Sequence, residues 1–457
     1  MKILLVPAIL LAHTLAVPVA DALTKADLER YSVAPIENHT LQAVSLGVIQ
    51  SGGSITAHAG TLAPDQPTSP DDRTLYEIGS ISKVFTSLLL AEAVVRGEVT
   101  LDLPIARLLP ADVVLPGKVG ERITLRMLAT HTSGLPRIPA DLSADNYVNP
   151  YATYGETELW ETLRRVKLDF EPGSKAGYSN LAAGLLGTLL ARSAGASYAE
   201  LLAKRITQPL GMADTVIEPD EKLRARFAPP FTATGKSWTH WDFRALAGAG
   251  GIRSTMADMM RFASAMLRPA ETPLQKAIEL AFTRQDLAAT FAPGGQALGW
   301  FLAGDGETRW HNGQTGGFHA AIFANPKLGV ATVLLSNRST PVGTEIAGSL
   351  FRRAAGKPER PMPNRDRAEV ELTSEQLDRC TGTFQISPKL AVVCEHRDLA
   401  LFVTPTDQPA DRLHAASANT FFSRRAPVEI VFEFPNDGKP ATSLVLKQGG
   451  RDVRGVK

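Results

Sequence analysis

The order of strand-like and helical segments constrains the fold of this chain more than any other feature of its sequence. Two runs with strand character lie near the start, at 43–49 and 54–58, and three more lie at 299–303, 318–324 and 331–336. The long stretch between them has the apolar spacing that is typical of helices. Folding this order into one body places the N- and C-terminal strands side by side in a sheet, with a helical block against it. We therefore predict an α/β fold.

The helices are predicted from apolar periodicity and from capping residues. Thr255 and Asp258, for example, have the spacing of a capping box. Between the first two strands, Ser51-Gly52-Gly53 predicts a hairpin turn. Helices are expected at 80–96, 156–167, 180–193, 197–206, 255–267, 273–283 and 342–355, and the polar residues 138–155 are expected to form a long surface loop.

The chain has 457 residues, which is too many for a typical single core, so two domains are expected. Residues 356–372 form a charged, Pro-rich linker. Residues 373–457 contain only short alternating runs, which predict a small all-β barrel or sandwich. The larger domain would then cover residues 23–355.

The N-terminal residues 1–22 have the pattern of a signal peptide. Lys2 precedes an apolar run at 3–12, and the stretch ends in the small-x-small sequence Ala20-Asp21-Ala22. We expect cleavage after Ala22 and a periplasmic or secreted protein, with an uncleaved anchor as the alternative. No other stretch is apolar enough to span a bilayer, so the mature chain is expected to lack a transmembrane span.

Export bears on the two cysteines of the chain. Because exported proteins fold in an oxidising compartment, we expect Cys380 and Cys394 to form a disulfide. Two free, buried thiols are the alternative.

The composition narrows the set of partners. A formal charge of +1 gives no electrostatic reason to expect nucleic acid as a partner, and a Gly-rich Walker loop is missing. The nine histidines show no spacing that is typical of metal ligands, so we expect neither a metal nor another cofactor. The sequence does not predict an oligomeric state.

A Ser-x-x-Lys quartet supplies the first candidate active-site residues. The extended run 75–78 leads to Gly79, and the helical pattern that follows puts Ser80 in its first turn, with Lys83 one turn further on the same face. A serine hydroxyl needs an adjacent base to act as a nucleophile, and a partly desolvated lysine can be that base. The free N–H groups of the first turn can stabilise an oxyanion. An ordinary capped helix is the alternative.

Two later stretches supply further candidates. Tyr178 precedes a predicted helix, and a tyrosine near a lysine can be held as a phenolate, or can share its proton, and then relay protons. Asn180 is suited to bind a substrate amide or Lys83. Further on, Trp310–Phe318 is a Gly-rich strand entry, which can lie alongside a substrate and donate main-chain N–H groups. A plain turn and a loose hairpin loop are the respective alternatives.

Together, the order and spacing of the three stretches resemble the serine β-lactamase and penicillin-binding superfamily, specifically its class C β-lactamase branch. That branch also contains DD-peptidases, AmpH-type carboxypeptidase/endopeptidases and β-lactamase-like esterases. Supporting matches lie at His131–Pro136 and Gly250–Thr255, and the resemblance covers residues 35–355. It implies an antiparallel sheet flanked by helices plus an all-helical block. The C-terminal residues resemble a lipocalin-like barrel, a match that rests on strand rhythm and on Gly382-Thr383-Phe384.

The resemblance also implies roles for the residues. Ser80 would attack the substrate carbonyl and become the acyl-enzyme. Lys83 and Tyr178 would shuttle protons, with Tyr178 as the general base for the deacylating water. The backbone N–H groups of Ser80 and Gln314 would form the oxyanion hole. The substrate, a β-lactam or a peptidoglycan peptide, would be bound by Asn180, His311, Asn312 and Gly313.

One departure from the family pattern bears on the substrate. His311 stands where β-lactamases usually have a lysine that helps to bind the substrate carboxylate. A histidine with a pKa near ~6.5 is mostly neutral at pH 7, which argues against strong β-lactamase activity. If His311 instead bound a carboxylate as an imidazolium, activity on such substrates would fall as the pH rises through its pKa. The leading hypothesis is an exported serine hydrolase acting on amides next to D-amino acids. A carboxylesterase and a slowly turning-over penicillin-binding protein are the alternatives.

Overall fold

The computed structural model describes residues 22–457 except for 38, 51–52, 143–147, 360–366, 368, 389, 398–399, 407–409, 425–426, 436–437 and 449–450. Several sequence predictions therefore lie wholly or partly outside the described residues. They include the signal peptide apart from Ala22, two residues of the first hairpin turn, residues 143–147 of the surface loop and part of the linker. None of the described helices is long and apolar enough to cross a membrane.

A six-stranded antiparallel sheet forms the centre of the larger body, with the strand order β2-β1-β8-β7-β6-β5. Val44 of β1 lies opposite Ser336 of β8, so the N- and C-terminal strands are neighbours, as predicted. A short antiparallel pair, β3 with β4, lies apart from this sheet. The strands are β1 (Ala43–Gln50), β2 (Gly53–Gly60), β3 (Leu75–Glu77), β4 (Arg253–Thr255), β5 (Phe301–Leu302), β6 (Arg309–Gln314), β7 (His319–Asn325) and β8 (Val330–Ser336).

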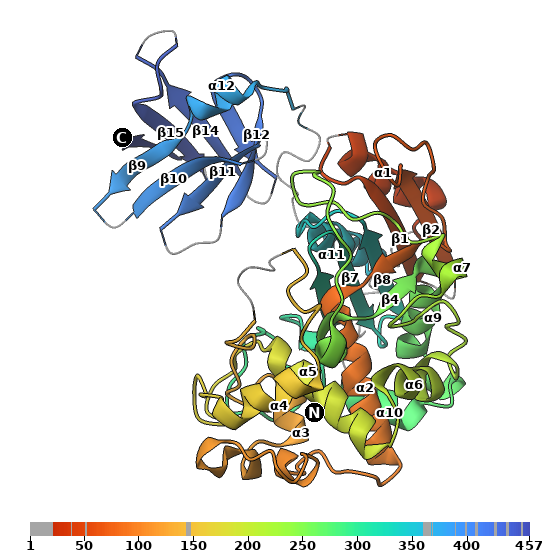
Figure 1. Ribbon diagram of the computed structural model, residues 1–457. Coiled ribbons are helices and arrows are strands. Elements are labelled where there is room, and N and C mark those ends of the chain that lie inside the picture. Colours follow the sequence, from red (N-terminus) through yellow and green to blue (C-terminus); the bar gives the residue numbers. More distant parts are fainter. Residues whose placement is uncertain are drawn as a thin grey trace, which may run out of the picture.

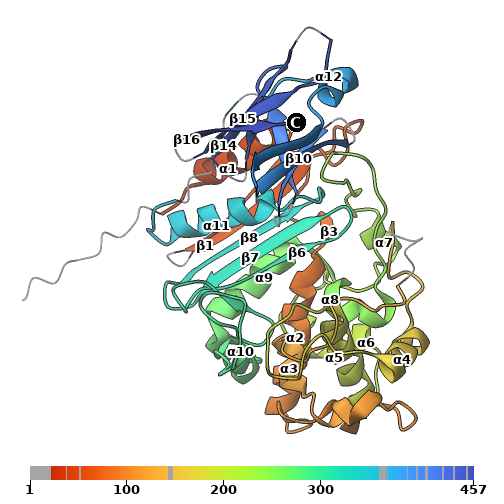
Figure 2. The same ribbon diagram turned by 90° about the vertical axis from the view of Figure 1, so that its left-hand side faces the viewer.

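Helices cover both faces of the sheet (Figure 2). The helices α1 (Lys25–Glu37) and α11 (Val342–Ala354) pack on one face, and α9 (Met256–Leu267) packs on the other. Every residue of β1 and β8 is buried, because layers lie on both sides. Helix α1 was not predicted, because its buried face includes Ser32 and Pro35, which hide the apolar pattern.

The helical block is built around α2 (Ser82–Val95), which follows the candidate nucleophile (Figures 1 and 2). Twelve of its 14 residues are buried, because α5, α8 and α10 surround it. Most predicted helices are confirmed to within a few residues, although the one at 197–206 changes to a π-helical turn at Ala203. The helices of this region are α3 (Leu125–Ala129), α4 (Glu156–Arg165), α5 (Asn180–Ser193), α6 (Tyr198–Leu202), α7 (Glu221–Arg224), α8 (Ala247–Gly250) and α10 (Gln275–Phe282).

The C-terminal residues form a closed barrel of eight antiparallel strands, which α12 (Ser374–Asp378) precedes (Figure 1). Its interior is filled by its own core, in which Phe432 makes edge contacts with Phe384 and Phe421. The sequence predicted either a barrel or a sandwich here, and the barrel is confirmed. The boundaries of the two domains stay a prediction. The strands are β9 (Gly382–Ser387), β10 (Leu390–Arg397), β11 (Ala400–Pro405), β12 (Asp411–Ala415), β13 (Thr420–Ser423), β14 (Val428–Glu433), β15 (Ser443–Gln448) and β16 (Arg451–Val456).

Charged side chains tie the barrel to the larger body. Glu369 accepts hydrogen bonds from His414 (2.9 Å) and Arg424 (3.3 Å), and Arg424 also donates to the hydroxyl of Thr40 (2.9 Å). The contact between Arg424 and Thr40 joins residues that are 384 positions apart in sequence. They place the strand end that holds Arg424 against the start of the larger body.

The disulfide expected between Cys380 and Cys394 is not formed. Both residues are free and buried, and the thiol of Cys380 donates to the carbonyl oxygen of Gln376 at 3.6 Å. Burial raises the pKa of each thiol to about 12. Because oxidation requires a thiolate, burial opposes the bridge at neutral pH.

Candidate active site

Ser80 lies in a tight turn just before α2, whereas the sequence placed it in the first turn of that helix. It is the middle residue of a 3-10 turn, η1 (Gly79–Ile81), and α2 begins only at Ser82. Gly79 has a φ of +50°, a left-handed conformation that glycine adopts without strain. The residue after the turn is held in place by a hydrogen bond, in which the main-chain N–H of Ile252 donates to Ser82 Oγ at 3.1 Å. Ser80 itself stays partly exposed.

Lys83 is buried directly beside the candidate nucleophile. Its Nζ donates to Ser80 Oγ at 2.9 Å and to the carbonyl oxygen of Ala249 in α8 at 2.6 Å. Burial, and then the positive charge of Arg137, lowers the pKa of Lys83 well below its ordinary value. The contact with Ala249 was not predicted, although the neighbouring Gly250–Thr255 stretch had been singled out.

Tyr178 completes this group of polar side chains. Ser80 is among the groups that influence the pKa of its phenol, and Lys83 Nζ lies 4.8 Å from the centre of its ring. Burial raises the pKa of Tyr178 above its ordinary value, and the nearby Ser80 and Arg137 offset this only in part. Of the two states considered from the sequence, the raised pKa favours a phenol that keeps its proton over a phenolate.

Asn180 is the first residue of α5 and faces an unexpected partner. Its Nδ2 donates to the hydroxyl of Tyr151 at 3.1 Å, while its buried Oδ1 has no hydrogen-bond partner among the described residues. Tyr151 was expected on a surface loop, but it is buried and its ring stacks on Phe243 at 4.7 Å. This part of the loop therefore belongs to the wall of the site.

The strand β6 touches the Ser80 turn because two glycines face each other there. A Cβ on Gly313 would lie 1.9 Å from the Ile78 carbonyl oxygen and 2.8 Å from the Ser80 nitrogen. A Cβ on Gly79 would lie 2.6 Å from the nitrogen of Gln314. The absence of both side chains lets the main-chain nitrogens of Ser80 and Gln314 come close together. This is the arrangement that an oxyanion hole requires.

Asn312, by contrast, is not brought to the site. Successive side chains of a strand point to opposite faces, so Asn312 lies on the face opposite to that of its two neighbours. Its Nδ2 donates to the hydroxyl of Thr344 in α11 at 3.0 Å. The substrate-binding role expected for Asn312 is therefore wrong, and the residue connects β6 to α11 instead.

His311 lies in the site as a neutral imidazole. Its Nδ1 lies 2.6 Å from the carbonyl oxygen of Asn312, so this nitrogen is the donor and Nε2 is an acceptor. The side chain is 1% exposed, and Nε2 has no partner among the described residues. Burial, with the charge of Lys83, lowers the pKa of His311 to about 3. Burial of this side chain therefore argues against an imidazolium that binds a carboxylate.

Two residues of the stretch around 131–137 also reach the site. His131 Nδ1 accepts the main-chain N–H of Ser179 at 3.1 Å, and its ring lies 4.4 Å from that of Tyr178. The guanidinium of Arg137 lies 5.2 Å from the centre of the same ring. The sequence had singled out His131–Pro136 but gave Arg137 no role.

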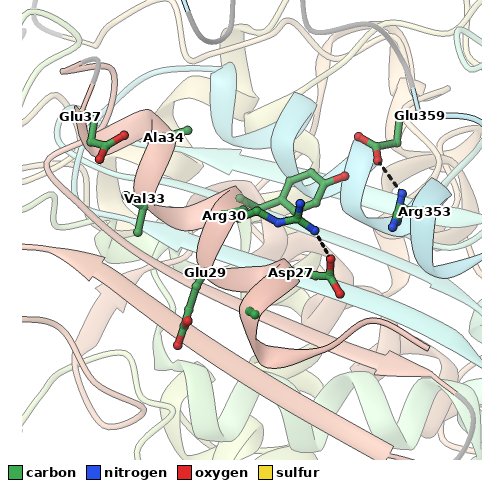
Figure 3. A pocket seen from close by; sticks show the side chains of 10 residues that line it. Asp27, Glu29, Arg30, Val33, Ala34, Glu37, Arg353 and Glu359 are labelled. Carbon is green, nitrogen blue, oxygen red and sulfur yellow. Dashed lines mark hydrogen bonds and ion pairs between the residues drawn. The ribbon is translucent and has the colours of Figure 1, made fainter. Parts of the chain in front are cut away.

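Other parts of the described chain offer no comparable chemistry. Its His, Cys, Asp and Glu side chains form no group of three that could hold a metal ion. A surface pocket between α1 and the end of α11 is lined by the ion pairs Arg30–Asp27 and Arg353–Glu359 and by the carboxylates of Glu29 and Glu37 (Figure 3).

Comparison with known proteins gives a consistent result. The sequence profile of a family described as Beta-lactamase matches residues 21–357. The D-alanyl-D-alanine carboxypeptidase/endopeptidase AmpH of Escherichia coli is 33% identical over 250 residues, which are 54% of this chain and 63% of that protein. A β-lactamase of Pseudomonas fluorescens is 28% identical over an alignment that covers 68% of this chain and 92% of that protein. Penicillin-binding protein 4 of Amycolatopsis lactamdurans is also 28% identical, over an alignment that covers 72% of this chain and 88% of that protein.

The neutral state of His311 can be measured directly. We expect its imidazole nitrogen resonances to stay at neutral shifts across the range of about pH 5 to 8, because a buried cation is costly. The variant His311→Gln assigns the signal, and the same protein unfolded in urea provides the reference titration near pH ~6.5. A titration midpoint inside that range in the folded protein would contradict the assignment.

Proposed function

This chain belongs to the β-lactamase family of serine hydrolases, and from that premise we propose that it opens amide bonds in β-lactams or D-amino-acid peptides through an acyl-enzyme on Ser80. The observation that carries the proposal is the 2.9 Å contact between Lys83 Nζ and Ser80 Oγ. The AmpH relative, whose name denotes D-alanyl-D-alanine cleavage, supports a peptide substrate. Because this chain spans only 63% of that relative, the specific substrate is part of the proposal.

Acylation would begin with a proton transfer from Ser80 Oγ to Lys83. The depressed pKa of Lys83 favours its neutral amine, which can accept that proton. As the Oγ–C bond forms and the C–N bond breaks, the departing nitrogen would take a proton from the phenol of Tyr178. Lys83 would then return a proton to Tyr178. This assigns the base to Lys83 and the protonated relay to Tyr178.

The charge that develops on the substrate oxygen needs donors that are already in place. The main-chain N–H groups of Ser80 and Gln314 would supply them, because Gly313 and Gly79 let these segments touch. Deacylation would use the same groups: a water attacks the ester carbon and gives a proton to the Lys83–Tyr178 pair. The bond between this carbon and Ser80 Oγ then breaks, the acyl group leaves as a carboxylic acid, and Ser80 Oγ takes the proton back from the pair. The unpartnered Asn180 Oδ1 would accept the N–H of a substrate amide.

We also propose that the protein is exported, because residues 1–22 have the charge, apolar run and small residues of a cleavable signal peptide. Peptidoglycan peptides lie outside the cytoplasmic membrane, so export would bring enzyme and substrate together. A carboxylesterase is the second candidate. The neutral His311 favours it, since an ester needs no cation at this position.

The acyl-enzyme gives the most direct test of the proposed function. We expect intact-protein mass spectrometry to show one added acyl group after brief exposure to benzylpenicillin, located on Ser80 by peptide mapping. Ser80→Ala should abolish the adduct. Ser174→Ala, which removes an exposed hydroxyl, should keep it. An adduct on another residue, or none with either a penicillin or a D-Ala-D-Ala peptide, would contradict the proposal.

The oxyanion hole is tested by adding one methyl group. Gly313→Ala should push β6 away from the Ser80 turn and lower kcat by ~10²–10³, the usual effect of losing an oxyanion donor. Gly304→Ala is the matched control, because a Cβ there would meet no atom within 4 Å. Equal kcat values for both variants would show that the close approach of β6 does not matter for the reaction.

A further inference from the structure

The described site lacks an obvious cation for a substrate carboxylate. Lys83 already bonds Ser80 and Ala249, and His311 is neutral. His131 uses Nδ1 as an acceptor, and burial lowers its pKa well below the ordinary value, so it is neutral as well. If the substrate carries a free carboxylate, another residue has to bind it.

Arg137 is placed at the mouth of the site by its own backbone. Its carbonyl oxygen accepts the N–H of Asn180 at 2.8 Å, and the neighbouring Pro136 carbonyl accepts the hydroxyl of Ser179 at 2.7 Å. These bonds fix the residue to the segment that holds Tyr178. The side chain is exposed, and its guanidinium lies 5.2 Å from the Tyr178 ring centre.

The guanidinium of Arg137 is also available to bind a ligand, unlike those of Arg253 and Arg126. Within the described part of the chain, its guanidinium makes no ion pair and no hydrogen bond. Arg253 instead donates to the Trp241 carbonyl oxygen at 2.6 Å and lies 3.4 Å from Asp242. Arg126 forms a two-pronged pair with Asp102, at 2.8 Å for each contact. An arginine fixed at its backbone and free at its head can receive a carboxylate with little rearrangement.

The charge of Arg137 influences several titratable groups of the site. It is among the causes that shift the pKa values of Lys83, Tyr178, Tyr151 and His131, so its head lies close to all four side chains. A group held between Ser80 and Arg137 would therefore lie over Tyr178. Since an arginine binds a carboxylate through two parallel hydrogen bonds, this position also orients the substrate.

We propose that Arg137 binds the free carboxylate of the substrate and so selects amides that carry one close to the bond that Ser80 attacks. This rests on the proposed function and narrows its substrate class. The guanidinium would supply the positive charge that a lysine in the place of His311 would otherwise provide. Arg137 would position the substrate and take no part in proton transfer.

The test compares two forms of one peptide. Acetyl-D-Ala-D-Ala with a free carboxylate and the same dipeptide as its C-terminal carboxamide differ only in the charge that Arg137 would bind. For the wild type, we expect kcat/KM to be higher for the free acid. Arg137→Gln should lower the ratio of the two kcat/KM values by ~10- to 100-fold, mostly through KM, as expected for a lost charge-assisted hydrogen bond. Arg137→Lys should restore part of it.

Two controls separate this proposal from the function that it rests on. Arg107→Gln, which removes an exposed arginine from the turn η2 (Ile105–Arg107), should leave the ratio unchanged. If Arg137→Gln slowed both peptides equally, Arg137 would act only by tuning Lys83 and Tyr178, and the carboxylate proposal would be overturned while Ser80 acylation still occurred. If the wild type formed no Ser80 adduct with either peptide or with penicillin, the proposed function would fail as well.

Discussion

The close approach of β6 to the Ser80 turn is the contact on which the rest of the site depends. It exists because Gly313 and Gly79 leave no side chains between two main-chain segments more than 200 residues apart. A methyl group at either position would overlap a main-chain atom of the other segment. The sheet sets the position of β6, and the buried helix α2 sets the position of the turn. The two halves of the larger body therefore meet at the proposed oxyanion hole.

Burial then decides which side chains carry charge. Lys83 and His311 are both shielded from water, so the pKa of each is lowered, and that of Tyr178 is raised for the same reason. The result is a site with an accessible amine, a protonated phenol and a neutral imidazole around one hydroxyl. Such a site suits proton transfer but has little positive charge for an anionic substrate. That is why an exposed arginine at its mouth becomes important.

Much of this could be predicted from the sequence. The pairing of N- and C-terminal strands followed from strands at both ends of a helical stretch, and Ser80, Lys83, Tyr178 and His311 were found from the order and spacing of their motifs. The remainder depends on tertiary contacts that spacing cannot reveal. The side of β6 on which Asn312 lies is fixed by its bond to Thr344, and the state of His311 is fixed by burial. The thiols of Cys380 and Cys394 are likewise kept protonated by a core that only the closed barrel creates.

The central claim is that one hydroxyl, one amine, one phenol and a glycine-lined strand act on a single substrate atom. A crystal structure of the protein with an arylboronic acid, which mimics the tetrahedral intermediate, tests it most directly. The account predicts boron bonded to Ser80 Oγ, with one boronate oxygen about 2.7–3.1 Å from the main-chain nitrogens of both Ser80 and Gln314. Boron bonded elsewhere, or a boronate oxygen that points away from Gln314, would contradict it.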